Sequence, residues 1–145
     1  ADYMVKKIGR GRNKTEITET SERFGAMNSC SVLGAFVKLY EITERKNYLD
    51  FANYIVESGM AKDFDLISAC EDDGLYPYMF KYTKAYEMTC CVIGVLGYYK
   101  VTGNKRYLDV AIDFVDKVIE TDYTMIGCSG CTDENFDNSS ERQTI

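Results

Sequence analysis

The chemistry open to this sequence of 145 residues is narrowed by its lack of histidine. Without an imidazole, these residues cannot build a Ser-His-Asp triad, a Cys-His pair or a histidine-based zinc site. Carboxylates, tyrosines and cysteines are therefore the groups from which a reactive site could be assembled.

Acidic side chains gather near the C-terminal end of the sequence. Glu134 lies close to Asp133 and Asp137, in a glycine-bearing polar stretch without helical periodicity. Carboxyl groups in such a stretch can act as acids or bases when their surroundings are right. By composition alone, the same stretch is typical of a solvated acidic loop.

The six cysteines could bind a metal, take part in redox chemistry or pack in the core. Cys128 and Cys131 have Cys-x-x-Cys spacing, but a structural zinc needs four ligands and no second such pair exists. Cys90, next to Cys91, recurs as Cys30 at the same place in an upstream segment. We therefore predict reduced, packed cysteines and assign no metal ligand. The cysteines do not assign the cellular compartment, which is either the periplasm or outside of the cell, or the cytoplasm.

Two similar helical hairpins must position these residues. Residues 29–58 and 89–118 share cysteine, valine and glycine positions near their starts, and after a one-residue gap they share Tyr-Leu-Asp. A repeat of this length is typical of a toroid or solenoid of helical hairpins. Gly34 and Gly94 fall at the same place in the middle of the two first helices, where glycine costs helix stability. This match predicts a close approach between helices.

We expect an all-α fold with hairpins over residues 26–58 and 84–119. Gly103 is expected to end the first helix of the later hairpin in a left-handed conformation. Pro77 interrupts the segment 59–83, which we expect to be a long inter-hairpin loop. A further loop is expected over 120–145. The apolar stripe of the last helix comprises Tyr107, Leu108, Ala111, Phe114, Val115 and Val118.

Composition and charge exclude several classes of partner. The formal net charge of −6 argues against nucleic acid, because phosphate binding needs a basic surface. No stretch is apolar and long enough to span a bilayer, and the sequence does not open with a signal peptide. We therefore expect neither nucleic acid nor a membrane as a partner.

Short motifs along the hairpins and the C-terminal stretch carry a family resemblance. They are Ser-Val-Leu, Leu-Tyr-Glu-Ile-Thr and Asn-Tyr-Leu-Asp-Phe-Ala within residues 31–52, Lys-Ala-Tyr-Glu-Met at 84–88, Tyr-Tyr-Lys-Val-Thr-Gly-Asn at 98–104, Ile-Gly-Cys-Ser at 126–129 and Glu-Asn-Phe at 134–136. In this order they resemble glycoside hydrolase family 127, the β-L-arabinofuranosidase-like group. The resemblance covers most of the chain from about residue 27 onward.

The resemblance implies an (α/α) toroid of six helical hairpins, of which this chain supplies about two. It also implies a carbohydrate substrate and hydrolysis of a terminal arabinofuranosyl unit or a related plant-type sugar. The glutamate of the family's Glu-x-Phe motif is the general acid/base, a role that passes to Glu134. A carboxyl group in a partly apolar pocket keeps its proton near neutral pH and can protonate a leaving oxygen.

The family's nucleophile is a cysteine. A Glu-Thr-Cys motif and a later Cys-Cys pair hold this cysteine together with a zinc ion. Neither motif follows Glu134 before the sequence stops at Ile145. No nucleophile or zinc ligand is therefore assigned here, and zinc is expected only in the full-length parent. We therefore expect the chain to be a fragment that is inactive alone. Its open flanks are expected to expose apolar surface, which favours self-association.

Three other residues are candidates for substrate binding. Glu87 would face the cleft of such a toroid, although a first-turn glutamate also stabilises a helix dipole. Tyr76 and Tyr78 could stack on a sugar ring or fill the gap between hairpins. Two other functions also stay open for the chain: a sugar epimerase or lyase on the same toroid, and a non-catalytic helical-repeat binding scaffold.

Overall fold

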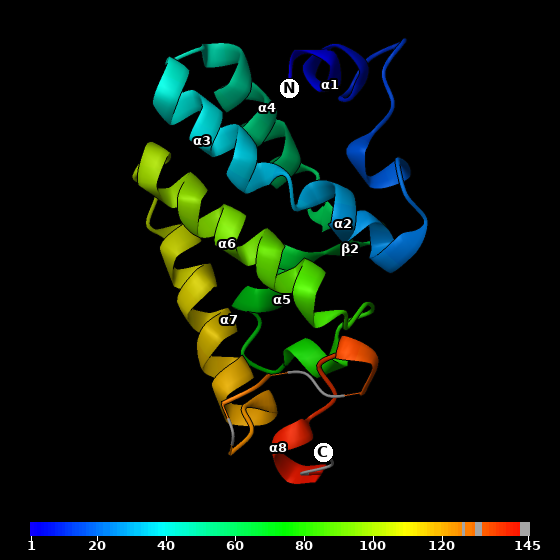
Figure 1. Ribbon diagram of the computed structural model, residues 1–145, viewed down its shortest axis with the longest axis vertical. Helices are drawn as coiled ribbons and strands as arrows, with labels where there is room; N and C mark the ends of the chain where they lie inside the picture. Colours follow the sequence, from blue (N-terminus) through cyan, green and yellow to red (C-terminus); the bar gives the residue numbers. More distant parts are fainter. Residues whose placement is uncertain (126, 130–131, 143–145) are drawn as a thin grey trace.

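Two antiparallel helical hairpins form the body of the molecule in a computed structural model that describes residues 1–125, 127–129 and 132–142 (Figure 1). In hairpin one, α3 (Leu33–Thr43) is followed by α4 (Lys46–Glu57). In hairpin two, α6 (Ala85–Thr102) is followed by α7 (Arg106–Asp122). The fold is mostly helical, which agrees with the predicted all-α class except for a pair of short strands within residues 60–65.

Short elements precede, separate and follow the hairpins. They are α1 (Asp2–Lys7), η1 (Ile17–Glu19), η2 (Arg23–Ala26), α2 (Met27–Cys30), β1 (Met60–Ala61), β2 (Phe64–Asp65), α5 (Leu66–Glu71), η3 (Pro77–Met79), η4 (Thr132–Glu134) and α8 (Ser139–Arg142). Within the described ranges, no helix combines the length and the apolar character needed to cross a membrane.

The segment 59–83 is more regular than the predicted loop. Strands β1 and β2 pair antiparallel, and α5 follows them directly with Asp65 as its N-cap, whose Oδ1 accepts a hydrogen bond from the Ser68 amide at 2.9 Å. At the other end of α5, the buried Lys117 of α7 donates to the carbonyl oxygens of Cys70 and Asp72, each at 2.7 Å. These elements are too short to show a period in the sequence, and tertiary contacts stabilise them.

The hairpins meet where α3 crosses α6, at the two glycines. A Cβ atom added to Gly94 would lie 3.0 Å from the Cβ of Leu33 and 3.1 Å from the backbone nitrogen of Gly34. One added to Gly34 would lie 3.7 Å from the Cα of Gly94. The predicted close approach is therefore confirmed, and Gly94 is the tighter of the two positions. Gly103 has the predicted left-handed conformation, with φ of 69°.

Hairpin two exposes positions that hairpin one buries. In hairpin one, Val56 is 7% exposed, and the side chain of Asn53, three residues earlier, accepts a hydrogen bond at 2.7 Å from Tyr98 of α6. Their counterparts in hairpin two are Val115, which is 48% exposed, and Ile112, which is 47% exposed. The prediction that Val115 lies on the buried stripe is therefore wrong.

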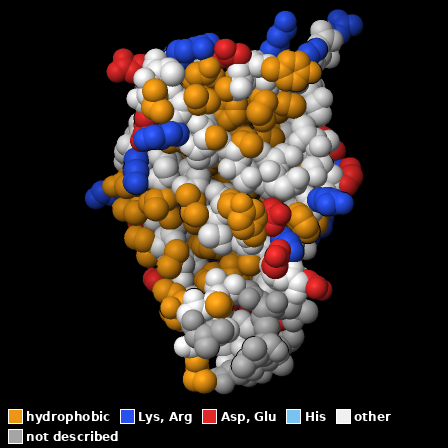
Figure 2. Space-filling view, in the orientation of Figure 1, with side chains coloured by type: hydrophobic (Ala, Val, Ile, Leu, Met, Phe, Trp, Pro, Cys, Tyr) orange, Lys and Arg blue, Asp and Glu red, His pale blue; other side chains and the backbone are white. Residues whose placement is uncertain are grey.

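Ile112, Val115 and Ile119 form an exposed apolar stripe on α7, with the helical spacing of three and four residues. We call it the outer stripe of α7. Figure 2 shows apolar side chains reaching the surface over α6 and α7. Among the described residues this stripe lies open, whereas on the equivalent face of α4 Val56 is buried and Asn53 is hydrogen-bonded to Tyr98 of α6.

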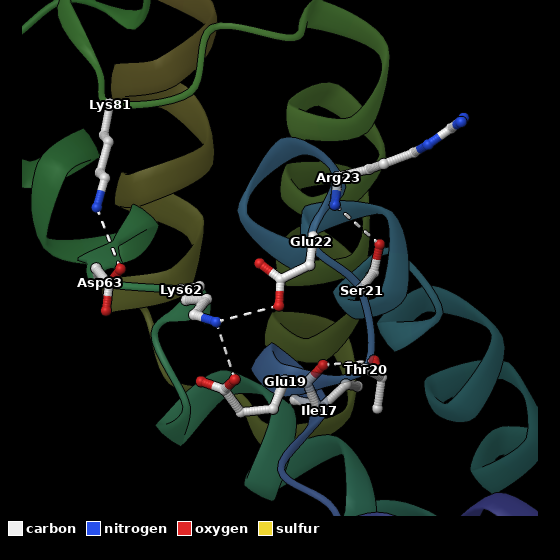
Figure 3. A network of polar contacts seen from close by, with 9 residues as sticks. All are labelled: Ile17, Glu19, Thr20, Ser21, Glu22, Arg23, Lys62, Asp63 and Lys81. Carbon is white, nitrogen blue, oxygen red and sulfur yellow. Dashed lines mark hydrogen bonds and ion pairs between the residues drawn. The ribbon is translucent and has the colours of Figure 1, made fainter.

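Polar contacts hold the N-terminal segment on the β1–β2 turn (Figure 3). The ammonium of Lys62 pairs with Glu19 at 2.9 Å and with Glu22 at 3.4 Å, and its backbone amide donates to the carbonyl of Gly25 at 2.8 Å. These contacts fix residues 17–26 beside α2, whose residue Met27 is fully buried. The N-terminal segment thus covers one side of hairpin one.

The two glycines should respond differently to alanine. Gly34→Ala adds a methyl group at an ordinary contact distance and should raise the free energy of unfolding by up to about 1 kcal/mol through helix propensity. Gly94→Ala forces its methyl group against rigid backbone and should lower that free energy by about 1–2 kcal/mol. Urea denaturation of both variants measures the difference. Equal effects of the two substitutions would contradict the close crossing.

Candidate functional site

The segment that carries Glu134 is packed against the N-terminal end of α6 (Figure 1). Lys84, the N-cap of α6, forms an antiparallel backbone bridge with Asn135. The amide of Phe136 donates to the carbonyl of Thr83 at 2.8 Å. The Phe136 ring is 1% exposed and packs edge-on against Phe114 of α7, with ring centres 5.8 Å apart. The aromatic residue of the Glu-x-Phe motif is therefore an anchor in the core.

A buried carboxylate holds the other side of this segment. Asp122, the last residue of α7, is fully buried, and its Oδ1 accepts hydrogen bonds from the amides of Asp137 at 2.8 Å and Ser139 at 3.4 Å. Thr121 donates to its Oδ2 at 2.8 Å, and the Ser139 hydroxyl donates to its carbonyl at 3.1 Å. Sequence reasoning missed Asp122. The pattern that could have identified Asp122 in the sequence is its helical spacing from Ala111 and Phe114, which places this acidic residue on the buried face of the helix.

Glu134 itself is accessible, with a side chain that is 76% exposed. Its backbone has a φ of 60°, in the left-handed region, which is unusual for a residue other than glycine. Its Oε2 forms an ion pair with the ammonium of Lys84 at 2.9 Å. The partly apolar pocket expected around this carboxyl group is not found in this arrangement, because most of the side chain faces solvent.

Glu87 lies in the first turn of α6, at the same helix end as the Lys84–Glu134 ion pair. Its side chain is partly buried, and its Oε2 has no hydrogen-bond partner among the described residues. A buried carboxylate oxygen without a partner is costly, so it is suited to accept a hydrogen bond from a ligand hydroxyl. Its place in the first turn also agrees with a helix-dipole role.

Tyr76 and Tyr78 stack on each other next to η3, with ring centres 6.1 Å apart and planes inclined by 27°. The Tyr76 hydroxyl donates to the carboxylate of Glu120 on α7, at 3.3 Å, and the charge of Glu120 raises the pKa of Tyr76. Because α7 runs antiparallel to α6, its C-terminal end lies at the same end of hairpin two as Glu134. The structure thus brings the four predicted residues to one end of one hairpin.

Three cysteines are packed in the core. Cys30, Cys70 and Cys91 are fully buried. Burial raises the pKa of the Cys30 and Cys70 thiols to about 12 and that of Cys91 well above its ordinary range. Cys91 donates to the carbonyl of Met27 at 3.4 Å, whereas Cys90 is only partly buried. Cys90 and Cys30 therefore hold equivalent positions in the repeat but differ in burial.

The Cys-x-x-Cys segment does not fit the prediction of packed cysteines. Cys128 is exposed, and Cys131 lies outside the described residues. Across residues 1–125, 127–129 and 132–142, no three cysteine, aspartate or glutamate side chains are grouped so that they could hold a metal ion. The described residues therefore do not fit a zinc site, and no chemical step is assigned to a metal.

Comparison with known proteins gives one family. A family model described as β-L-arabinofuranosidase, GH127 catalytic domain, matches residues 1–144. No curated protein and no solved structure matches the chain. The family match spans both hairpins and the segment that carries Glu134.

Loss of the Asp122 carboxylate should detach the C-terminal segment. Asp122→Ala leaves the amides of Asp137 and Ser139 without their acceptor and should lower the free energy of unfolding by about 2–4 kcal/mol. The matched control is Asp116→Ala, an exposed position on the same helix, with an expected change within about 0.5 kcal/mol. Chemical denaturation followed by circular dichroism measures both. Equal values would show that Asp122 is not the anchor.

Proposed function

The chain belongs to the family of GH127 β-L-arabinofuranosidase catalytic domains, and on that premise we propose that it is part of a glycoside hydrolase acting on arabinofuranosides or related plant-type sugars. Membership in a glycosidase family implies a carbohydrate substrate. Glu134 is the proposed general acid/base. The proposal for this residue rests on its Glu-x-Phe motif and on the way the chain holds that motif.

The observation that carries the proposal is the contrast between Glu134 and its neighbours. Phe136 is buried in the core, and Asp122 binds the backbone that follows, yet the Glu134 carboxyl group remains accessible to a ligand. A general acid needs this combination, because its carboxyl group must reach the substrate from a fixed backbone. Glu134 would give its proton to the glycosidic oxygen as the bond to the sugar breaks.

Glu87, Tyr76 and Tyr78 are the proposed substrate contacts. The partnerless Oε2 of Glu87 would accept a hydrogen bond from a sugar hydroxyl. The stacked Tyr76–Tyr78 pair would offer an aromatic surface to the apolar face of a sugar ring. Their common position at one end of hairpin two supports this assignment.

The remaining machinery is proposed to lie in a longer parent protein. The family's zinc-held cysteine nucleophile has no assigned counterpart in this chain, so the chain alone should not hydrolyse a glycoside. The outer stripe of α7 supports the same proposal, because at the equivalent positions of hairpin one Val56 is buried and Asn53 is hydrogen-bonded to Tyr98 of α6. A further hairpin of an (α/α) toroid would cover the stripe in the same way.

Replacement of Glu134 tests the catalytic assignment in the enzyme that contains this chain. Glu134→Gln should lower kcat by about 10²- to 10⁴-fold, because glutamine cannot donate a proton. The loss should be larger for an alkyl arabinofuranoside than for a nitrophenyl arabinofuranoside, whose leaving group needs little protonation. Initial rates on both substrates give the answer, with the exposed Asp133→Asn as control. Unchanged turnover of the alkyl substrate would refute the role.

The isolated chain should self-associate through the outer stripe of α7. Sedimentation velocity is expected to show a concentration-dependent shift from monomer to larger species, because the stripe is apolar and uncovered. Val115→Lys should move the distribution toward monomer. Ser68→Lys adds the same charge at an exposed position on α5 and should leave the distribution unchanged. A monomer at all concentrations would count against the open stripe as a contact surface.

A further inference from the structure

Lys84 is the least exposed of the ion-paired lysines among the described residues, followed by Lys62. Its side chain is 17% exposed, although its partner Glu134 is 76% exposed. The Lys81–Asp63 pair is ordinary by comparison, with both side chains about half exposed or more and a separation of 3.3 Å. Such surface pairs contribute little, because holding two mobile side chains together costs entropy. Lys84 is already held in place by other contacts.

Those contacts reach three successive residues of the segment that carries the candidate acid. The Lys84 ammonium donates to the carbonyl oxygen of Asp133 at 2.7 Å and pairs with Glu134 at 2.9 Å. The Lys84 backbone bridges to Asn135. The ammonium also lies over the ring of Phe24, 5.4 Å from its centre. One side chain thus contacts both the backbone and the carboxylate of the site.

We propose that Lys84 is a positioning residue that directs the Glu134 carboxylate and holds its backbone against the start of α6. This inference rests on the proposed function of Glu134. The ion pair at 2.9 Å directs the Glu134 carboxylate toward the start of α6. When Glu134 takes up a proton, the ion pair is lost and the carboxyl group can turn to the substrate.

The hydrogen bond from Lys84 to the Asp133 carbonyl allows the Glu134 side chain to turn without moving its backbone. The Lys84 ammonium keeps the Asp133 carbonyl as an acceptor when Glu134 is protonated, so the backbone stays in place while the side chain turns. Glu134 then passes its proton to the glycosidic oxygen and becomes a carboxylate again. Lys84 can pair with that carboxylate again until it takes a proton from the attacking water.

Hydrogen exchange tests the contact without any need for activity. In the isolated chain, Lys84→Met should raise the exchange rate of the Phe136 amide, which donates to the carbonyl of Thr83, at least about tenfold, because local opening becomes easier. Lys84→Arg keeps a cation and should stay near wild type. Lys81→Met is the control and should leave the exchange of this amide unchanged. Wild-type protection in Lys84→Met would overturn the proposal.

Kinetics in the enzyme that contains this chain separate positioning from simple stabilisation. Lys84→Met should lower kcat by about ten- to a hundredfold with little change in KM, because a misplaced acid slows the chemical step. Lys84→Arg should recover most of the loss. In a Glu134→Gln background, Lys84→Met should have no further effect. A further loss in that background would overturn the positioning role.

The two experiments distinguish the two proposals. If Glu134→Gln leaves hydrolysis unchanged, the proposed function fails, whereas the hydrogen-exchange result still decides whether Lys84 holds the segment. If Glu134→Gln abolishes hydrolysis and Lys84→Met leaves kcat unchanged, the positioning role alone is refuted.

Discussion

The crossing of α3 and α6 at Gly34 and Gly94 is the contact on which the rest of the structure depends. A Cβ added to Gly94 would meet the backbone nitrogen of Gly34 at 3.1 Å, so the helix backbones themselves are in contact. This contact, together with the side chain of Leu33 against Gly94, fixes hairpin two on hairpin one. The N-terminal end of α6 is thereby placed, and Lys84 at that end receives the segment that carries Glu134.

Buried polar groups then hold the loops that the hairpins leave free. Lys117 and Asp122 both lie on the inner face of α7, and each binds backbone groups of a different loop. A charged group in the core is costly unless it is bonded, so each one favours a single loop position strongly. Together with Phe136, Asp122 keeps the backbone around Glu134 in place while the Glu134 carboxyl group stays accessible.

The repeat also explains an asymmetry between the hairpins. Val56 and Val115 hold the same position in the two copies, yet one is buried and the other is half exposed. The outer stripe of α7 is apolar, and its side chains are about half exposed among the described residues. As part of the proposed toroid of hairpins, α7 would present this face to a further hairpin.

The sequence by itself determined the helical hairpins, the crossing at the two glycines, the left-handed Gly103 and the family. These features depend on local periodicity, on glycine's lack of a side chain and on short motifs, all of which are visible along the chain. Only the tertiary structure decided that Lys84 and Asp122 hold the segment that carries Glu134, that α5 and the β1–β2 pair exist, and that Val115 is exposed. Lys84 contacts residues almost fifty positions away, and a pairing across that distance leaves no periodic signal in one sequence.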